Sequence, residues 1–574
     1  MIVKKIIAAT KSQSKYSFII NLIFSLSIAA LEAISLTAII PLLLMIIDPK
    51  NKHIEFLKII FANNNLIVIN FNFTLFLFIG LVFFLRFFIT TVASYQLANY
   101  RMKIQEHFSK KSLFNFLSSK YIEFKKKNST DLITFVNKET EIFSTCVDSL
   151  IKIISEIFVI LIIVAALLWQ NAKFTIVIVF FTLVVSFYFS FFFKKKIHEW
   201  GEIRRKSDQN RLLRLKEIFQ FFKEIVVFKK QQEFIHRYEY FNHKTQVAQR
   251  NRIFTGTITR GLIELVVTLL LLLSIAYLTL SSTDKTQYHN FLIFFFIGVV
   301  RIFPSVSKII QGIQLINFSN EIINQHYFLA KRHMKKIKIL KKKKPNFFKN
   351  GTNKNILKIS RLSFGYPDGV LVFNNINIEA KDGDIIGVTG ESGKGKSTFA
   401  EILLGLMKPV SGTIKFNGKN IYSHIDDWLD LSSYVSQQNQ VISGSIYDNI
   451  ALGFFTSQKQ KEKINSLIYK LNRNLFLRIK KRMNLPAISD GKNLSGGEIQ
   501  RISIARAIYK NPKILILDEF TSSIDFINEK EILEEISKLS KGRIIFIISH
   551  KKSTLSICNK IYEIKKSRPK KINE

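Results

Sequence analysis

Cysteine is almost absent from this sequence, since Cys146 and Cys558 are the only two among 574 residues. Two cysteines so far apart imply no disulfide framework of the kind that stabilises small secreted domains. Cys146 lies near an apolar stretch, and Cys558 lies close to the C-terminal end of the chain. We therefore expect the soluble part of the chain to face the cytosol.

Acidic residues are also few, with 42 Asp and Glu against 84 Lys and Arg, which leaves a formal net charge of +42. Such a surplus can indicate a nucleic-acid partner, but here the basic residues are dispersed over loops and no basic and aromatic binding module accompanies them. A composition rich in Lys, Ile and Asn, and the bias of cytoplasmic loops towards Lys and Arg, account for the same surplus. We expect no nucleic-acid partner.

Hydrophobic residues are abundant, at 48%, and most of them lie in the first 320 residues. The chain is too long for one core, so two large domains are expected. The apolar stretch after Lys15 is far longer than the core of a secretory signal and is interpreted as a retained first helix. Apolar runs long enough to cross a bilayer predict six spanning helices, at residues 16–47, 67–98, 147–169, 173–193, 253–280 and 288–318.

The loops between these spans differ in charge, which predicts the orientation of the protein. Segments 101–146 and 194–252 are long and rich in Lys and Arg, whereas the other connections are short or sparsely charged. The long segments are therefore expected on the cytoplasmic side of the inner membrane. Apolar residues recur there at helical spacing, so the spanning helices are expected to continue beyond the bilayer.

The domain boundaries follow from changes in composition. Residues 1–330 are predicted to form a transmembrane domain with cytoplasmic coupling loops, and the basic segment 331–355 is interpreted as a linker. Residues 356–574 are predicted to form a second, soluble domain, which opens with alternating strands at 356–359 and 371–373. Its polar tail, 565–574, is expected to fray.

The clearest motif is the segment 390–398, which reads G-E-S-G-K-G-K-S-T and fits the phosphate-binding pattern G-x-x-x-x-G-K-[ST]. It follows a strand-like run at 385–388 and opens a helix-like segment, which is the context that the motif requires. The glycines leave room for backbone N–H groups around a phosphate, Lys396 can reach the β and γ oxygens, and Ser397 offers a hydroxyl to Mg²⁺. ATP and Mg²⁺ are therefore predicted to bind at Gly390, Glu391, Ser392, Gly393, Lys394, Gly395, Lys396, Ser397 and Thr398.

Two further motifs make an isolated glycine-rich turn a poor explanation. The run 514–519 ends a buried-type strand with Asp518 and Glu519, which suits Asp518 as a metal ligand and Glu519 as the base that orients the attacking water. Upstream, the segment 494–501 reads L-S-G-G-E-I-Q-R and opens an apparent helix. Ser495, Gly496, Gly497 and Glu498 thus form a second anion-binding turn, which one chain needs only if two chains share their sites.

Together these motifs resemble the ATP-binding cassette (ABC) family, in its exporter form, and the resemblance covers nearly the whole chain. It implies an α-helical transmembrane domain fused to a C-terminal α/β P-loop ATPase domain with an antiparallel β subdomain and a helical subdomain. It also implies that Tyr366 stacks on adenine, Gln437 touches Mg²⁺ and water, Asp525 crosses a dimer interface and His550 senses the γ-phosphate. The family pattern is weak at 488–491, and Glu498 stands where Gln is common.

A membrane domain followed by one cassette resembles half-transporters that work as homodimers in the lipid bilayer. Charges inside the predicted spans bear on the substrate, because burying them is costly unless they face a cavity or a partner. Glu32, Arg86 and Arg301 are such residues, and Arg260 with Glu264 form a further pair one helical turn apart. Pairing among them is one explanation, and an anionic ligand between Arg86 and Arg301 is the other.

The local sequence around these charges, L-E-A at 31–33 and R-I-F-P-S at 301–305, resembles that of flippases for lipid-linked oligosaccharides. The resemblance implies an amphipathic anionic substrate that carries a pyrophosphate. Exporters of lipid A-like lipids, polysaccharide, peptides or drugs remain alternatives, and so does a cassette ATPase without transport, which the six spans disfavour.

Overall fold

The structure is a computed structural model of the whole chain. It describes residues 2–11, 15–37, 71–170, 172–280, 285–340, 355–366, 371–391, 393–453, 457–471, 483, 486–487, 494–521 and 526–564. The chain divides into two compact units. The first comprises Met1–Ser119 and Phe124–Lys341, and the second comprises Lys120–Glu123 and Lys342–Glu574.

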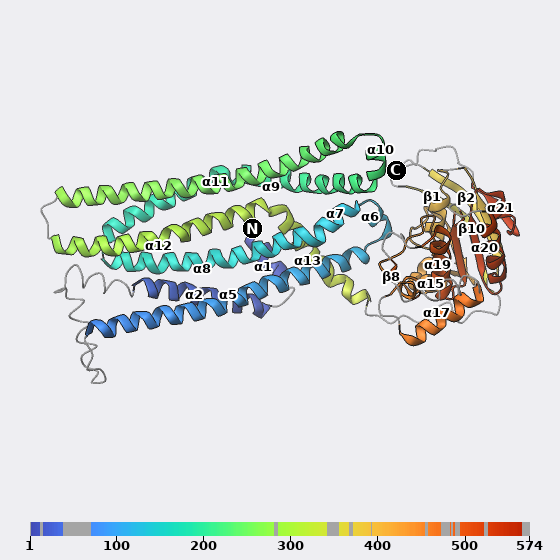
Figure 1. Cartoon of the computed structure of the whole chain (residues 1–574), viewed down its shortest axis with the longest axis horizontal. Helices are drawn as coiled ribbons and strands as arrows, with labels where there is room; N and C mark the ends of the chain where they lie inside the picture. Colours follow the sequence, from blue (N-terminus) through green and yellow to red (C-terminus); the bar gives the residue numbers. More distant parts are fainter. Residues whose placement is uncertain are drawn as a thin grey trace. The chain divides into compact units, whose positions relative to one another are not determined.

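The described part of the first unit consists of helices joined by short turns (Figure 1). Its last helix continues through Leu340, into the segment that was interpreted as a linker. The elements in chain order are α1 (Ile2–Thr10), α2 (Lys15–Thr37), α5 (Phe71–Leu117), α6 (Tyr121–Lys125), α7 (Ser129–Thr134), the π-helical turn η1 (Phe135–Glu139), α8 (Thr140–Gln170), α9 (Ala172–Gln220), α10 (Phe222–Val227), α11 (Gln231–Leu280), α12 (Lys285–Phe318) and α13 (Asn320–Leu340).

Four helical stretches among the described residues are long and apolar enough to cross a membrane: Phe76–Leu117, Ser129–Trp169, Thr175–Gln220 and Gln231–Leu270. Each falls on a predicted span, and helices α2 and α12 overlap the remaining two. The count of six spans stays a prediction, since residues 38–70 lie outside the described part. Large side chains such as Phe187 and Phe191 of α9 are exposed, which suits contact with lipid.

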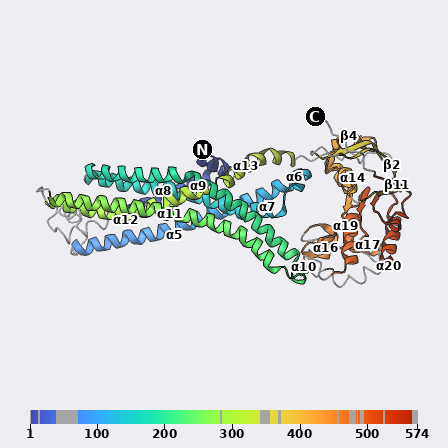
Figure 2. The same ribbon diagram turned by 90° about the horizontal axis from the view of Figure 1, so that it is seen from above.

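Helices α9 and α11 are too long to be explained by a bilayer alone. They contain 49 and 50 residues and run side by side for most of their length (Figures 1 and 2). At about 1.5 Å per residue each is roughly 70 Å long, more than twice the ~30 Å of a hydrocarbon core. The short helix α10 joins them, so the predicted protruding helix pair is present as a continuous structure.

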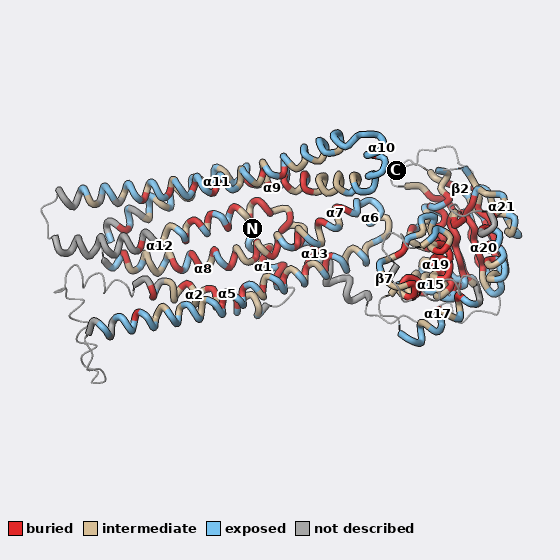
Figure 3. The backbone as a smooth tube through the Cα atoms, in the orientation of Figure 1, coloured by how far each residue is buried: buried red, intermediate tan, exposed pale blue. Residues whose placement is uncertain are grey.

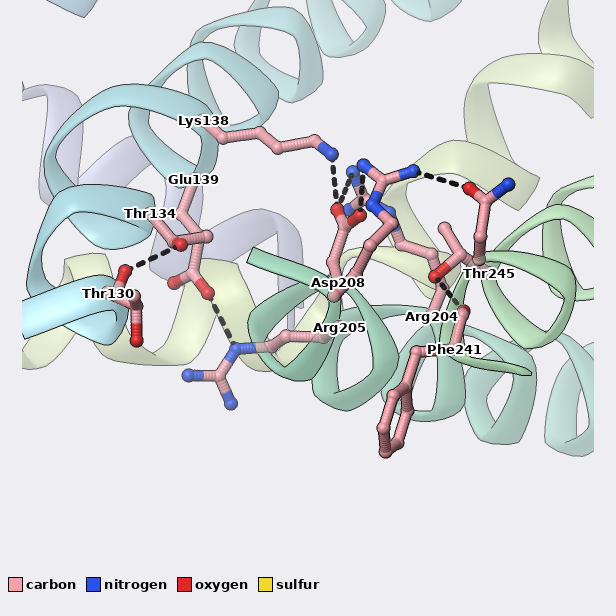
Figure 4. Close-up of polar contacts among 11 residues, drawn as sticks. Thr130, Thr134, Lys138, Glu139, Arg204, Arg205, Asp208, Phe241 and Thr245 are labelled. Carbon is pink, nitrogen blue, oxygen red and sulfur yellow. Dashed lines mark hydrogen bonds and ion pairs between the residues drawn. The ribbon is translucent and has the colours of Figure 1, made fainter. Parts of the chain in front are cut away.

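Buried ion pairs hold the polar parts of these helices together. The side chain of Asp208 on α9 is only 3% exposed and contacts Lys138 of η1, as well as Arg204 and Arg211, at 3.5 and 2.8 Å (Figure 4). Arg211 also donates to Asn242 of α11 at 3.0 Å. One carboxylate thus neutralises cations from two elements, which stabilises the cluster because an unpaired buried charge is costly.

A second carboxylate extends this network to α13. Glu139 of η1, which is also buried, accepts a hydrogen bond from Arg205 of α9 at 2.8 Å (Figure 4). The other end of the Arg205 guanidinium donates to Gln325 of α13 at 3.1 Å. The network therefore joins η1, α9, α11 and α13.

Because Asp208 neutralises several cations, the change Asp208→Asn should lower the free energy of unfolding by about 3 kcal/mol, the lower end for breaking a buried ion pair. Thermal unfolding in detergent measures the effect as a lower transition temperature. Glu233→Gln is the matched control, since Glu233 belongs to an exposed pair with Lys230 and its loss should leave the transition unchanged. Equal transitions for the two variants would contradict a stabilising role of Asp208.

The described part of the second unit contains two larger sheets and a short strand pair. An antiparallel sheet has the order β2-β1-β4-β5, with β1 (Ile356–Gly365), β2 (Leu371–Lys381), β4 (Ser411–Phe416) and β5 (Lys419–Asn420). The pairing of β1 with β2 agrees with the two predicted strands. A parallel sheet has the order β11-β3-β10-β9-β6, with β3 (Ile385–Thr389), β6 (Ser432–Val435), β9 (Ile514–Asp518), β10 (Ile544–Ile548) and β11 (Lys560–Glu563).

Helices cover the sheets and build a further small core. They are α14 (Lys396–Leu403), the 3-10 turn η2 (Ile421–Ser423), α15 (Ile425–Leu431), α16 (Ile446–Ala451), α17 (Gln458–Leu471), α19 (Gly496–Tyr509), α20 (Phe526–Leu539) and α21 (Lys552–Leu555), with β7 (Gly444–Ser445) paired to β8 (Pro486–Ala487). Isoleucines of α16, α17 and α19 pack together as one cluster. In the parallel sheet every residue of β9 and β10 is buried (Figure 3), so polar chemistry begins only where these strands end.

Candidate functional site

The phosphate-binding loop follows β3 and opens helix α14, as its motif requires. Gly390 and Gly395 have φ angles of 154° and 90°, which favour glycine. A side chain at Gly390 would also collide with the backbone oxygen of Ile564, 2.8 Å away. The Lys396 ammonium donates to the backbone oxygens of Gly390 and Glu391, at 2.8 and 3.2 Å. The lysine therefore lies inside the curve of the loop, where a phosphate would meet it.

Other residues of the loop have different surroundings. Lys394 pairs with Glu391 at 2.8 Å, and the Glu391 side chain is largely exposed. Thr398 is buried, and its hydroxyl lies 3.0 Å from the phenol oxygen of Tyr366. Tyr366 is thus held against the start of α14, while its stacking on adenine stays a prediction. Ser392 lies outside the described residues.

The metal-binding candidates meet at the end of β9. Asp518 is 2% exposed, and burial raises the pKa of its carboxyl, whereas hydrogen bonds from Tyr434 and Ser397 oppose that rise. The Tyr434 phenol donates to Asp518 Oδ2 at 3.0 Å. A hydroxyl and a carboxylate are oxygen ligands of the kind that Mg²⁺ takes together with water and phosphate oxygens. The residues present therefore fit Mg²⁺.

Glu519 begins the turn after β9 in an uncommon backbone conformation, with φ 43°. Its N–H donates to the backbone oxygen of Ile548 on β10 at 2.9 Å, which holds the turn in place. The Gln437 amide donates to Glu519 Oε2 at 2.6 Å, and His550 Nδ1 lies 3.4 Å from Oε1. Three residues from separate loops thus converge, while the roles of Glu519 as the base, of Gln437 as a contact of Mg²⁺ and water, and of His550 as a γ-phosphate sensor stay predictions.

The second anion-binding turn caps helix α19. The Ser495 hydroxyl accepts from the Glu498 N–H at 3.2 Å, and the Glu498 carboxylate accepts from the Ser495 N–H at 3.0 Å. Glutamate and glutamine both form such a reciprocal capping box, so the glutamate at 498 leaves the cap of α19 intact. Ser495 and Gly496 are exposed, so the turn is open at the surface. Asp525 and the weak segment 488–491 lie outside the described residues.

The membrane charges show pairing. The Arg86 guanidinium lies 3.9 Å from Glu32 Oε1 and donates to the Ser35 hydroxyl at 2.9 Å. Arg260 and Glu264 lie 4.0 Å apart with about half of each side chain exposed. The side chain of Arg301 lies outside the described part of the chain. The structure therefore joins Glu32 with Arg86, and the two-arginine anion site stays a prediction.

Tyr434 lies at the site, but no role was predicted for it from its residue type or position in the chain. It lies on β6, in parallel register with Ile516 of β9, so its side chain shares a face with Asp518 two residues further on. The pairing of β6 beside β9 is what brings the phenol to the carboxylate. The position of Tyr434, three residues before Gln437, indicates a contact with Asp518 only when the pairing of β6 with β9 is known.

A phosphate-binding loop, a buried carboxylate and a following glutamate at the ends of parallel strands define a P-loop ATPase domain. Comparison with known proteins extends this to the whole chain. Residues 17–303 match the family model of the ABC transporter transmembrane region, and residues 373–522 match the family model of the ABC transporter. The chain belongs to the ABC transporter family. ATP is the nucleotide of such a domain, with Mg²⁺ as its usual partner.

Several relatives with named functions are similar to this chain over part of their length. The alpha-hemolysin translocation ATP-binding protein HlyB of Proteus vulgaris is 34% identical over 214 residues, which cover 37% of this chain and 30% of HlyB. A multidrug resistance ABC transporter ATP-binding and permease protein of Lactococcus lactis subsp. cremoris is 33% identical over 211 residues, 37% of this chain and 36% of the relative.

The heterocyst differentiation ATP-binding protein HepA of a Nostoc species is 31% identical over 321 residues, 54% of this chain and 49% of HepA. The chain therefore spans less than half the length of each of these relatives.

The variant Glu519→Gln should retain ATP binding but lose turnover by a factor of roughly 10² to 10⁴, the usual contribution of a general base. Phosphate release measures turnover, and a fluorescent ATP analogue measures binding. Glu379→Gln on the exposed side of β2 is the control and should hydrolyse ATP normally. Near-normal hydrolysis by Glu519→Gln would remove Glu519 from this role.

Proposed function

We propose that this protein is an ATP-driven ABC exporter of the inner membrane, whose cytoplasmic ATPase domain hydrolyses ATP to move a substrate across the bilayer. The observation that carries this proposal is the convergence of Gln437, Glu519 and His550 beside a buried Asp518. Membrane-length helices continuous with polar extensions supply the transport part. The names of two relatives, an alpha-hemolysin translocation protein and a multidrug resistance ABC transporter, also support this proposal.

The residues of the site have separate roles in this proposal. Lys396 and the backbone N–H groups of its loop bind the phosphates, while Ser397 and Asp518 hold Mg²⁺. Mg²⁺ supplies charge neutralisation at the phosphate oxygens when bound. Glu519 accepts the proton of the attacking water, and Gln437 keeps the carboxylate of Glu519 aimed by donating to its second oxygen.

A homodimer completes the site in this proposal. Each chain has a phosphate-binding loop and a second turn at Ser495 that is exposed and therefore available to a partner. The α10 tip supports the same conclusion, because Phe222, Val227 and Phe228 are more than half exposed on a polar extension of the helices. Exposed apolar groups of this kind favour a protein partner over water.

Cysteines at Glu391 and Gly497 test the dimer, since Glu391 is exposed and a side chain at Gly497 meets open space. One change is placed on each of two differently tagged chains in a Glu519→Gln background, where bound ATP persists. We expect a disulfide between the two tags that depends on ATP. The parent with its native thiols is the control, and a lack of mixed-tag product would contradict the shared site.

We propose further that the substrate is amphipathic and anionic, with a lipid-linked oligosaccharide as the first candidate. The support is an arginine at 86 and another at 301 within predicted spans, where a pyrophosphate offers bidentate partners. The pair of Arg86 with Glu32 favours a structural role for that arginine, so Arg301 carries most of this proposal. Peptides and drugs are the second candidate, favoured by the names of the relatives.

Arg301→Ala should abolish the stimulation of ATP hydrolysis by a polyprenyl-pyrophosphate saccharide in nanodiscs, without lowering the unfolding temperature. Arg301→Lys should keep part of the response, because the charge remains and the fork geometry is lost. An uncharged polyprenyl glycoside is the ligand control. A full response from Arg301→Ala would contradict the anionic substrate.

Glu32→Gln and Arg86→Ala separate the structural pair from the substrate site. If both lower the unfolding temperature equally and the folded fraction still responds to the saccharide, the two residues stabilise helix packing. Loss of the response by Arg86→Ala alone would instead support contact with the substrate.

A further inference from the structure

Two hydrogen-bonded tyrosines and two carboxylates lie in one part of the second unit. Tyr434 on β6 donates to Asp518, the metal-binding candidate, at 3.0 Å. Tyr121 belongs to the short segment Lys120–Glu123. The residues before and after this segment belong to the first unit, but the segment itself belongs to the second. Its phenol donates to Glu401 Oε1 on α14 at 2.9 Å.

Glu401 connects the two tyrosines. It lies on α14, the helix that the phosphate-binding loop opens, and is therefore close to the nucleotide site. Glu401 lies four residues after Ser397, one turn along the same face of α14. The Ser397 hydroxyl hydrogen-bonds to Asp518, so α14 links Glu401 to Asp518 and thereby to Tyr434.

The neighbours of Tyr121 make its position well defined. Tyr121 and Ile122 pack against the main hydrophobic core of the second unit, together with Tyr366 and Val372. A phenol anchored in this way holds its hydrogen bond to Glu401 through packing as well as through polarity. The segment Lys120–Glu123 is thereby attached to the helix that follows the phosphate-binding loop.

We propose that Tyr434 is a positioning residue for the Asp518 carboxylate, and that Tyr121 and Glu401 extend this support to the segment Lys120–Glu123. The placement of that segment then sets how well the site binds its metal. A metal-ligating carboxylate needs such outer partners, because a free carboxylate rotates and loses ligand geometry. The inference rests on the proposed ATPase function and adds the residues through which the segment reaches the metal.

Tyr434→Phe removes the donor and keeps the ring. In the full-length protein it should raise the Mg²⁺ concentration for half-maximal ATP hydrolysis by about tenfold or more, the usual effect of losing an outer partner of a metal ligand. Binding of a fluorescent ATP analogue in the presence of EDTA should be unchanged. A wild-type Mg²⁺ requirement in Tyr434→Phe would overturn the positioning role.

Tyr422→Phe is the matched control. Tyr422 is buried in the same unit, and its phenol donates to the backbone oxygens of Ile402 and Met407 at 2.8 and 2.9 Å. Its loss removes two buried hydrogen bonds near α14 without touching Asp518. It should lower the unfolding temperature and leave the Mg²⁺ requirement as in the wild type. If Tyr422→Phe raised the Mg²⁺ requirement as much as Tyr434→Phe does, both effects would be explained by a general loss of stability, and the proposal would be overturned.

Tyr121→Phe tests the extension to the segment. It should raise the Mg²⁺ requirement in the same direction by a smaller factor, and the double variant with Tyr434→Phe should show no more than the effect of Tyr434→Phe alone. Such non-additivity is the signature of residues that act through one group. Independent, multiplying effects, or no effect of Tyr121→Phe, would overturn the link.

Metal binding without turnover separates this inference from the proposed function. Electron paramagnetic resonance measures the binding of Mn²⁺ together with ATP. If the wild type binds Mn²⁺ but hydrolyses no ATP, the proposed function fails. The role of Tyr434 is then still tested, because Tyr434→Phe should bind Mn²⁺ more weakly. Equal Mn²⁺ binding by the two proteins would overturn the inference whatever the turnover.

Discussion

The parallel pairing of β3, β9 and β10 is the constraint on which the catalytic part of this molecule depends. Parallel strands end at one edge of a sheet, and here that edge carries the phosphate-binding loop, Asp518 with Glu519, and the turn before His550. The strand interiors are buried and apolar, so the register has little freedom. A shift of one residue would turn Asp518 to the other face of the sheet and separate it from Ser397 and Tyr434.

Each unit contains a buried aspartate whose charge needs polar partners. Asp208 and Asp518 differ in which partners they have and in what those partners make possible. Asp208 gathers several cations between packed helices, where no ligand is needed and pairing stabilises the fold. Asp518 has only neutral hydroxyl donors as its described hydrogen-bond partners, Tyr434 and Ser397, so its charge remains available for a cation. The contrast between an ion-paired carboxylate and a hydroxyl-supported one distinguishes a structural site from a binding site.

Much of the catalytic domain was predictable because its motifs carry their own structural context. The glycines at 390 and 395, the strand ending at Asp518 and the capped turn at Ser495 each depend on local chemistry, which a sequence displays directly. The contacts of Tyr434 and Tyr121 were not predictable, since they depend on which strands pair and on where a distant segment packs. The pair of Glu32 with Arg86 shows the same limit, because residue types within a span do not reveal their partners.

The capping box at the start of α19 has a consequence for how a phosphate would be received there. A serine hydroxyl has one proton to donate and two lone pairs to accept with, and the cap uses only a lone pair. The cap therefore does not consume the Ser495 proton, and the helix dipole makes the exposed start of α19 attractive to anions. The Glu498 carboxylate is buried and accepts the backbone N–H of Ser495, so its negative charge is held against the protein while Ser495 and Gly496 stay exposed.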